Sequence, residues 1–349
     1  MKVLLVSPLP PPSGGIATWT DEFLNSDISR KNHIEVINIA IKGNRVNELT
    51  KKNIFDEIKR NISIFSDVKN KFKKNKYDLA HINSSCSKMG IIRDYLIAKY
   101  LHKNNIKIIV QYHCDTKQYI NTKKKEKYFV KLSNIADKIF VLNTSSKKHI
   151  KEITGIDSII IPNFINDNIP LKDNEKIVNN DIKNILFVGR ITKNKGCFEI
   201  IQMAKRMKNI NFKLIGSITE EIKQCKTGEN VTFTGEVSKD VVIEEMKKSD
   251  LLLFPSYSEG FPLVILESMA LGLPIITTPV GAIPDMLEDK GGAYIEINNL
   301  DDMEEKIESL RDKKLRENIS KWNIKKVKEC YCRDKVVEHI FQEYEKVIN

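Results

Sequence analysis

The chain has 349 residues, 41% of them hydrophobic, which is enough for two domains with buried cores. No window holds the ~18 consecutive apolar residues that a membrane-spanning helix needs. The N-terminal apolar run Val3–Val6 is shorter than the ~7–15 residues of a signal-peptide core, and prolines follow it at once. We therefore expect a cytoplasmic protein.

The net charge of +11 is unevenly distributed. Residues 1–165 contain 29 Lys and Arg against 15 Asp and Glu, whereas residues 166–349 contain 28 against 31. A basic first half indicates an anionic partner, which could be a nucleic acid, a membrane surface or a phosphorylated substrate.

The six cysteines are scattered along the chain, and Cys330 and Cys332 are the only close pair. Two residues apart on a helix, they would not face each other, and no histidine pair completes a zinc set. We expect all six to be reduced thiols, as is usual in cytosolic proteins.

Twelve short strands, separated by longer helical segments, are predicted in chain order. Most are continuous apolar runs, which is typical of parallel sheets covered on both faces. Strands alternating with helices twice over predict two doubly wound, Rossmann-like α/β domains. The expected strands are Val3–Ser7, Ile34–Ile39, Leu79–Asn83, Lys107–Tyr112, Lys138–Leu142, Ser158–Pro162, Asn184–Gly189, Asn211–Gly216, Val231–Gly235, Asp250–Pro255, Pro274–Thr278 and Ala293–Ile297.

Ligands of open α/β sheets bind at the carboxyl ends of strands, so the segments that follow strands carry the candidate sites. Gly14 and Gly15 follow the first strand and precede a helix, where backbone could approach an anion; a tight turn explains them equally well. His113 follows the fourth strand and could exchange a proton or bind a sugar hydroxyl, or it could be structural.

In the second half, Arg190 and Lys195 follow the strand Asn184–Gly189. A guanidinium beside an ammonium suits a diphosphate, although a solvated charged loop would look the same in sequence.

The segment Ser258–Pro274 carries two carboxylates around a turn. Pro262 suits the first turn of a helix, so Gly260, Phe261 and the first helical N–H groups should favour an anion. Glu267 falls in the second turn and could accept hydrogen bonds from vicinal hydroxyls such as those of a ribose. Glu259 precedes the turn and could face sugar hydroxyls or a cationic transition state. An ion pair with a nearby lysine is the alternative for each glutamate.

Two segments together resemble the retaining glycosyltransferases of family 4, which have the GT-B fold and use nucleotide-sugar donors. The segments are Phe187-Val-Gly-Arg190 with Lys195-Gly196, and Pro255–Ile276, which carries a two-glutamate motif. The resemblance covers most of the chain in order. It implies an acceptor-binding domain at 1–165, a linker at 166–183, a donor-binding domain at 184–328, and a C-terminal helix at 329–349 that packs back on the first domain.

The resemblance also implies roles for individual residues. Arg190 and Lys195 would bind the donor diphosphate, Glu267 the ribose, and Glu259 the transferred sugar, with His113 near that sugar and Gly15 near the diphosphate. Backbone groups of Gly260, Phe261, Leu263 and Val264 would help to bind the donor, and the loop containing Val237 would meet the nucleobase. No metal cofactor is expected, and a UDP-sugar is favoured over a GDP-sugar. The chain departs from the family pattern at Cys114, Phe164 and Ala282.

Basic residues in Lys51–Lys76 are interleaved with Ile54, Ile58, Ile62, Phe65, Val68 and Phe72, and a second basic cluster spans Lys117–Lys131. This pattern suggests an amphipathic helix on an anionic membrane, although a solvated helix over an ordinary core fits as well. We expect a peripheral enzyme that extends a glycan, such as one linked to polyprenyl diphosphate. One alternative is a GT-B nucleotide-sugar 2-epimerase. The other is a nucleic-acid-binding protein, but the sequence contains no recognised nucleic-acid-binding motif.

Overall fold

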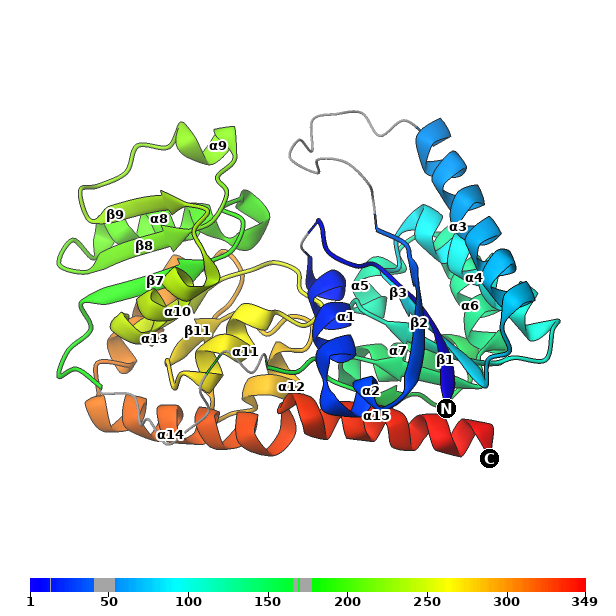
Figure 1. Cartoon of the computed structure of the whole chain (residues 1–349). Coiled ribbons are helices and arrows are strands. Elements are labelled where there is room, and N and C mark those ends of the chain that lie inside the picture. The colour runs from blue at the N-terminus through cyan, green and yellow to red at the C-terminus, as the bar shows by residue number, and fades with distance from the viewer. Residues whose placement is uncertain (13, 41–53, 166–168, 170–177) are drawn as a thin grey trace. The chain divides into compact units, whose positions relative to one another are not determined.

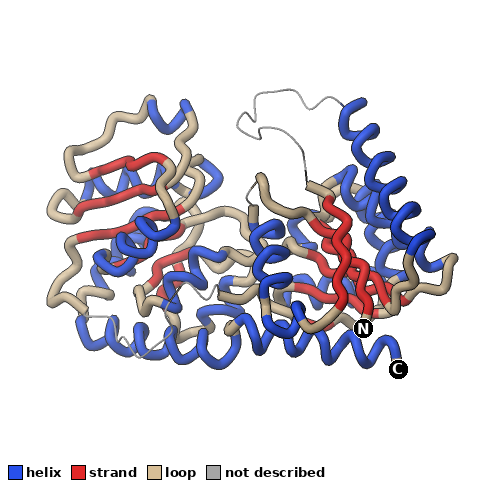
Figure 2. The backbone as a smooth tube through the Cα atoms, in the orientation of Figure 1, coloured by secondary structure: helices blue, strands red, loops and turns tan. Residues whose placement is uncertain are grey.

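The computed structural model describes residues 1–12, 14–40, 54–165, 169 and 178–349, and the chain divides into two compact units. Unit 1 comprises Met1–Phe164 and Arg333–Asn349, and unit 2 comprises Ile165–Cys332. Each contains a six-stranded parallel sheet with helices around it, which confirms the predicted pair of doubly wound α/β domains (Figures 1 and 2). All twelve predicted strands are present.

The sheet of unit 1 has the strand order β2-β1-β3-β4-β5-β6. Its strands are β1 Lys2–Ser7, β2 His33–Asn38, β3 Leu79–Ser84, β4 Lys107–Tyr112, β5 Lys138–Val141 and β6 Ile159–Ile160. The helices are α1 Gly15–Asn25, α2 Asp27–Arg30, α3 Ile54–Lys74, α4 Lys88–His102, α5 Thr116–Tyr119, α6 Lys123–Ile135, α7 Thr144–Thr154 and α15 Arg333–Ile348.

Alternate side chains of each strand in unit 1 enter two separate cores. Leu4 and Val6 of β1 point to the core shared with α3, α4 and α6. Val3 and Leu5 point to the opposite core, which α1 and α15 complete. Both faces are therefore buried, which explains why the strands appear in the sequence as continuous apolar runs.

The C-terminal helix α15 is part of unit 1, as the GT-B resemblance implied. Val337, Ile340 and Tyr344 are buried in the core that also contains Trp19 and Phe23 of α1. The Tyr344 hydroxyl lies 2.5 Å from Nδ1 of His81 on β3. The core between the sheet, α1 and α15 is thus built from residues near both ends of the chain.

The sheet of unit 2 has the order β12-β11-β10-β7-β8-β9, and α11 packs against α14 while α8 contacts α13. Its strands are β7 Asn184–Val188, β8 Asn211–Ile215, β9 Val231–Gly235, β10 Leu251–Phe254, β11 Ile275–Thr277 and β12 Gly292–Tyr294. The helices are η1 Lys193–Lys195, α8 Cys197–Arg206, α9 Glu220–Lys223, α10 Lys239–Lys248, α11 Leu263–Ala270, α12 Ile283–Leu287, α13 Leu300–Ser309 and α14 Lys313–Cys330.

Helix α3 corrects one detail of the predicted amphipathic helix. Val68 is fully buried, and Phe65 and Phe72 pack against the core with α4, so this part of the apolar stripe faces protein. Ile58 and Ile62 are 39% and 65% exposed, and Phe55, one turn earlier on the same face, is 73% exposed. Lys51 and Lys52 lie outside the described residues, as does most of the predicted linker. Among the described residues, no helix is both long and apolar enough to cross a membrane.

Candidate active site

The loop that follows β7 carries Arg190 and Lys195 at the carboxyl edge of the unit 2 sheet. It contains the short helix η1 and ends at Gly196, which has φ +72° and caps the start of α8. A Cβ atom at Gly196 would overlap the backbone carbonyl of Pro255. Glycine is therefore required both by the left-handed backbone and by the close approach of the next loop.

The loop that follows β10 is joined to this first loop by several contacts. The Tyr257 N–H donates to the carbonyl oxygen of Asn194 at 3.0 Å, and its hydroxyl donates to Glu199 on α8. Nζ of Lys195 forms an ion pair with Oε1 of Glu259. The two segments that the sequence analysis selected as donor-binding thus form one continuous surface in unit 2.

A third loop, which follows β11, packs against the backbone of Glu259 and Gly260. The backbone of Gly281 has φ +60°, and a Cβ there would overlap the carbonyl of Glu259. The Ala282 N–H donates to the Gly260 carbonyl at 2.9 Å. Ala282, which stands where the family usually has glycine, is fully buried, so its methyl group is accommodated beneath the loop.

Helix α11 begins directly after this turn, with Pro262 at its N-cap position and no side chain capping it. The first N–H groups of a helix have no intrahelical partner and carry the positive end of the helix dipole. Leu263 and Val264 are partly exposed, whereas Phe261 is buried. The start of α11 therefore offers N–H donors beside Lys195 and Glu259.

Glu267, in the second turn of α11, is paired with Lys239 at 3.1 Å. Burial raises the pKa of Glu267, and the Lys239 ammonium lowers it. Lys239 is the first residue of α10 and follows the loop containing Val237, which is partly exposed. Both glutamates of the motif thus have a lysine partner, which is the alternative that the sequence left open, and Lys239 is a residue that sequence reasoning missed.

In unit 1, His113 lies at the carboxyl end of β4, where its backbone N–H donates to the Ser84 carbonyl. Its ring packs edge-on against Trp19 at a centroid distance of 5.1 Å, and burial lowers its pKa to about 3. A neutral imidazole is a hydrogen-bonding group at pH 7 and not a charged acid. Gly14 and Gly15 begin α1, and nothing lies within 4 Å of a Cβ built at Gly15.

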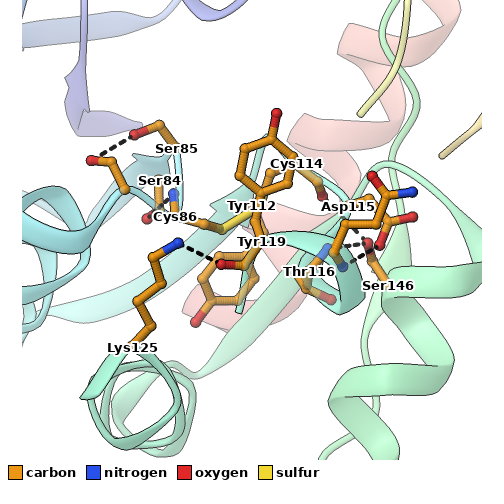
Figure 3. Close-up of a disulfide and its surroundings, with 12 residues drawn as sticks. Ser84, Ser85, Cys86, Tyr112, Cys114, Asp115, Thr116, Tyr119, Lys125 and Ser146 are labelled. Atoms are coloured by element: carbon orange, nitrogen blue, oxygen red, sulfur yellow. Dashed lines mark hydrogen bonds between the residues drawn. A yellow bond between two sulfur atoms is a disulfide. The ribbon is translucent and has the colours of Figure 1, made fainter. Parts of the chain in front are cut away.

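Cys86 and Cys114 form a disulfide in unit 1, so the prediction that every cysteine is a free thiol was wrong for this pair (Figure 3). Ser84 and Tyr112 are register partners at the ends of β3 and β4, and each cysteine lies two residues beyond the end of its own strand. The sequence did not show this equal spacing, because the predicted strand ended at Asn83 and β3 ends at Ser84. Beside the disulfide, Asp115 caps α5 by accepting from the N–H groups of Lys117 and Gln118.

Phe164, the second departure from the family pattern, packs its ring 6.0 Å from that of Trp19 in the unit 1 core. In the part of the chain that the structure describes, no three His, Cys, Asp or Glu side chains are grouped as they would be around a metal ion. Metal independence stays a prediction, as do the ligand contacts of the residues above.

Two solved structures have the same architecture along almost the whole chain. Sucrose-phosphate synthase from Thermosynechococcus elongatus aligns with a TM-score of 0.79 at 16% identity, covering 99% of this chain and 98% of that one. Anabaena HepE in complex with UDP aligns with a TM-score of 0.75 at 13% identity, covering 99% and 100%. These likenesses, with the two parallel sheets, show that the fold is GT-B.

Sequence comparison defines the family. The family model of glycosyl transferases group 1 matches residues 168–326. The chain is also 30% identical over 323 residues to the capsular polysaccharide biosynthesis glycosyltransferase CapM of Staphylococcus aureus, covering 82% of this chain and 83% of CapM. The chain belongs to the glycosyl transferases group 1 family and is a glycosyltransferase.

Proposed function

We propose that this glycosyltransferase moves a hexosyl or N-acetylhexosaminyl group from a nucleotide sugar to a glycan acceptor, with retention of anomeric configuration, in bacterial surface-polysaccharide biosynthesis. The observation that carries the proposal is the joined pair of loops in unit 2, which holds Lys195 against Glu259 beside the start of α11. CapM, by its name, acts in capsule biosynthesis, and HepE was solved with UDP, which supports a UDP-sugar over a GDP-sugar.

The donor diphosphate would be bound by cations and by backbone N–H groups. Arg190 offers a fork of donors and Lys195 a point charge, while Leu263 and Val264 offer the N–H groups of the first turn of α11. These groups act on the charge that develops on the leaving diphosphate as the sugar bond breaks. We propose that they make a divalent metal unnecessary.

The two glutamates would recognise hydroxyl groups. Glu267 would accept hydrogen bonds from the ribose once Lys239 gives up part of its contact, with the loop at Val237 meeting the nucleobase. Glu259 would face the transferred sugar when Lys195 turns towards the diphosphate. His113 of unit 1, being neutral, would hydrogen-bond a hydroxyl of that sugar, and Gly15 would allow the backbone to approach the phosphates.

A thermal-shift panel of nucleotide sugars and nucleoside diphosphates tests the donor site, because a bound ligand stabilises the folded protein by mass action. We expect UDP and at least one UDP-sugar to raise the melting temperature, and GDP to have a smaller effect. The panel would overturn the proposal if no nucleotide shifted the melting temperature. NMR of the anomeric proton in the product tests retention, and an inverted product would contradict the mechanism.

Single substitutions separate the two glutamates. Glu267→Ala should weaken UDP binding by roughly 10- to 100-fold, the usual effect of losing hydrogen bonds to a charged group. Glu259→Ala should reduce kcat by a similar or larger factor and leave UDP affinity nearly unchanged. The reverse pattern would exchange the two roles.

We further propose that the enzyme is cytoplasmic and associates with the inner membrane face, where it meets a lipid-linked acceptor such as a polyprenyl-diphosphate glycan. Ile58 and Ile62 on α3 are exposed beside the exposed Lys59, and apolar groups next to cations suit the surface of an anionic bilayer. Sedimentation with anionic and neutral vesicles tests this. Ile58→Ser with Ile62→Ser should reduce binding to anionic vesicles, whereas Val241→Ser, at an exposed site of unit 2, should not. Equal sedimentation of both variants would contradict it.

A further inference from the structure

A group of buried polar side chains follows the apolar part of two neighbouring strands in unit 1. On the face covered by α1 and α15, Leu79 of β3 and Ile109 of β4 are apolar core residues. Further along the same face of these strands come His81, Asn83 and Gln111, and Asn83 is the register partner of Gln111. All three are fully buried. His113 continues this face beyond the end of β4.

Several polar atoms of these residues are buried and make no hydrogen bond within the part of the chain that the structure describes. Nε2 of His81, Oδ1 of Asn83, both amide atoms of Gln111 and Nε2 of His113 are buried and have no partner among the described residues. Nε1 of Trp19 is also buried and without a hydrogen-bond partner in this part of the chain. Buried polar atoms in folded proteins are almost always satisfied, and internal water typically does so when several of them converge.

Tyr344 fixes the direction of hydrogen bonding at one end of the group. Its hydroxyl is fully buried, burial raises its pKa well above the ordinary value, and its partner is Nδ1 of His81. A buried phenol must donate its proton, so the Tyr344 hydroxyl donates to Nδ1 of His81. Because a neutral imidazole has one N–H, the proton of His81 then lies on Nε2.

His81 is neutral under ordinary conditions. Burial lowers its pKa to about 3 and the neighbouring His113 lowers it too, while a hydrogen-bonding contribution from Gln111 acts in the opposite direction. Because Nε2 of His81 carries the proton, it needs an acceptor, and the carbonyl oxygen of Gln111 is buried without a partner among the described residues. An oxygen turned towards His81 leaves the NH₂ group of Gln111 for another acceptor.

We propose that Gln111, together with internal water, connects His81 to His113 and fixes the tautomer of His113. The hydrogen-bond chain runs from the Tyr344 hydroxyl to His81. Internal water then links Nε2–H of His81 to the Gln111 carbonyl, and links the Gln111 NH₂ group to Nε2 of His113. The proton of His113 is then on Nδ1, and this N–H is the donor to a hydroxyl of the transferred sugar. Gln111 and Tyr344 are positioning residues that act through His113. The last step rests on the proposed function, whereas the tautomer does not.

The test uses the full chain labelled with ¹⁵N in its six histidines. Protonated and unprotonated imidazole nitrogens give well-separated ¹⁵N signals, so the tautomer of each ring is read directly. We expect His113 to be a single Nδ1–H tautomer and His81 a single Nε2–H tautomer at pH 7. The exposed His33 gives the reference signal of a freely exchanging ring. Mixed tautomers, or Nε2–H on His113, would overturn the proposal.

Two variants interrupt the proposed chain of hydrogen bonds at different residues. Gln111→Leu should convert His113 to mixed tautomers, and Tyr344→Phe should do the same to His81. The control is Tyr112→Phe, which removes another fully buried hydroxyl of unit 1, bonded to Ser133 at 2.8 Å in the opposite core. The relay, meaning the hydrogen-bond chain from Tyr344 to His113, does not exist in either of two cases. One is that the control shifts the tautomers of both rings as strongly as these variants, and the other is that Gln111→Leu leaves the His113 tautomer unchanged. Should Tyr344→Phe fail to fold, Gln111→Leu decides alone.

Kinetics then separate this inference from the proposed function. If His113 contacts the sugar, Gln111→Leu should lower kcat about tenfold with little change in the KM of the nucleotide sugar, since one oriented hydrogen bond is lost. A changed tautomer with unchanged kcat would leave the relay in place and remove His113 from the reaction. An unchanged tautomer would reject the relay whatever the rate.

Discussion

Lys239 and Glu267 form a 3.1 Å ion pair that joins the first residue of α10 to the second turn of α11. Burial raises the pKa of Glu267 and Lys239 opposes this effect. The ammonium therefore keeps the carboxylate ionised in a position where water alone would do so poorly. If Glu267 binds ribose, the same lysine prepares it as an acceptor before the donor arrives.

Replacing Lys239 with Met should make UDP binding depend on pH. Without the ammonium, the pKa of Glu267 rises further, so the carboxyl takes up a proton as the pH falls and accepts hydrogen bonds less well. Affinity should drop by up to about tenfold per pH unit below the new pKa, while the wild type stays flatter. Calorimetry with UDP at pH 8, 7 and 6 measures this. The control is Lys223→Met, which breaks an exposed pair with Glu220; matching pH profiles for the two variants would contradict the prediction.

Gly281→Ala should damage the site more than Gly235→Ala. Both glycines have positive φ, +60° and +74°, so both variants suffer backbone strain of ~1–3 kcal/mol. A Cβ at Gly281 also overlaps the Glu259 carbonyl, whereas one at Gly235 meets nothing within 4 Å. Urea unfolding and UDP titration of both variants should show the larger loss of stability, and the larger loss of affinity, for Gly281→Ala. Equal losses would mean that the loop at Glu259 can move away.

Gly15→Ala tests whether a ligand approaches the start of α1. The position is exposed, and an added Cβ touches nothing in the protein. Alanine at a compatible site usually adds a few tenths of a kcal/mol of stability. We therefore expect an unchanged or slightly higher melting temperature together with a fall of at least about tenfold in kcat/KM. Wild-type kinetics would show that the diphosphate does not come close to Gly15.

The buried imidazole of His113 should make unit 1 less stable in acid. Its folded pKa is about 3, below the ordinary value of 6.5. Its contribution to stability is therefore present above pH 6.5 and is lost as the pH falls towards 3, because the unfolded chain takes up the proton first. Between pH 7 and pH 5 the wild type should lose about 2 kcal/mol more than His113→Asn.

Tryptophan fluorescence can report this loss for unit 1 alone. The chain has two tryptophans, Trp19 in unit 1 and Trp322 in unit 2, so Trp322→Phe leaves a single probe beside His113. Urea unfolding in that background gives the free energy at each pH. Identical pH dependence with and without His113 would mean that water reaches the ring.

The disulfide between Cys86 and Cys114 determines how many thiols should react before and after reduction. Denatured, unreduced protein should show four reactive thiols and reduced protein six. Cys86→Ser should lower the unfolding free energy of unit 1 by about 3 kcal/mol, the usual effect of opening a loop of this length, 28 residues. Cys330→Ser, at an exposed free cysteine, should have little effect. Six thiols without reductant would contradict the pairing.

The sequence was most informative where structure depends on nearby residues. Lys107–Tyr112 was predicted with its observed bounds, because a parallel strand buried on both faces is a local apolar run. The loops at Gly196 and Pro262 could also be predicted, since glycine and proline mark turns and helix starts by their own backbone limits.

Contacts between distant segments could not be predicted in the same way. The partner of Glu267 depends on how the loop after β9 meets α11, and no spacing within the chain encodes that contact. On α3 the sequence showed an apolar stripe, but only packing reveals that Val68 faces the core while Ile62 faces solvent. The pairing of Cys86 with Cys114 likewise required the register of β3 and β4.

The place of α15 in unit 1 affects how the protein is made. Its core needs Val337, Ile340 and Tyr344, yet the ribosome adds these residues only after all of unit 2. At ~5–20 residues per second, the N-terminal segment waits roughly 10–30 s with part of its apolar face open. During that interval Trp19 and Phe23 lack the helix that covers them, so the nascent chain is a natural client for a chaperone.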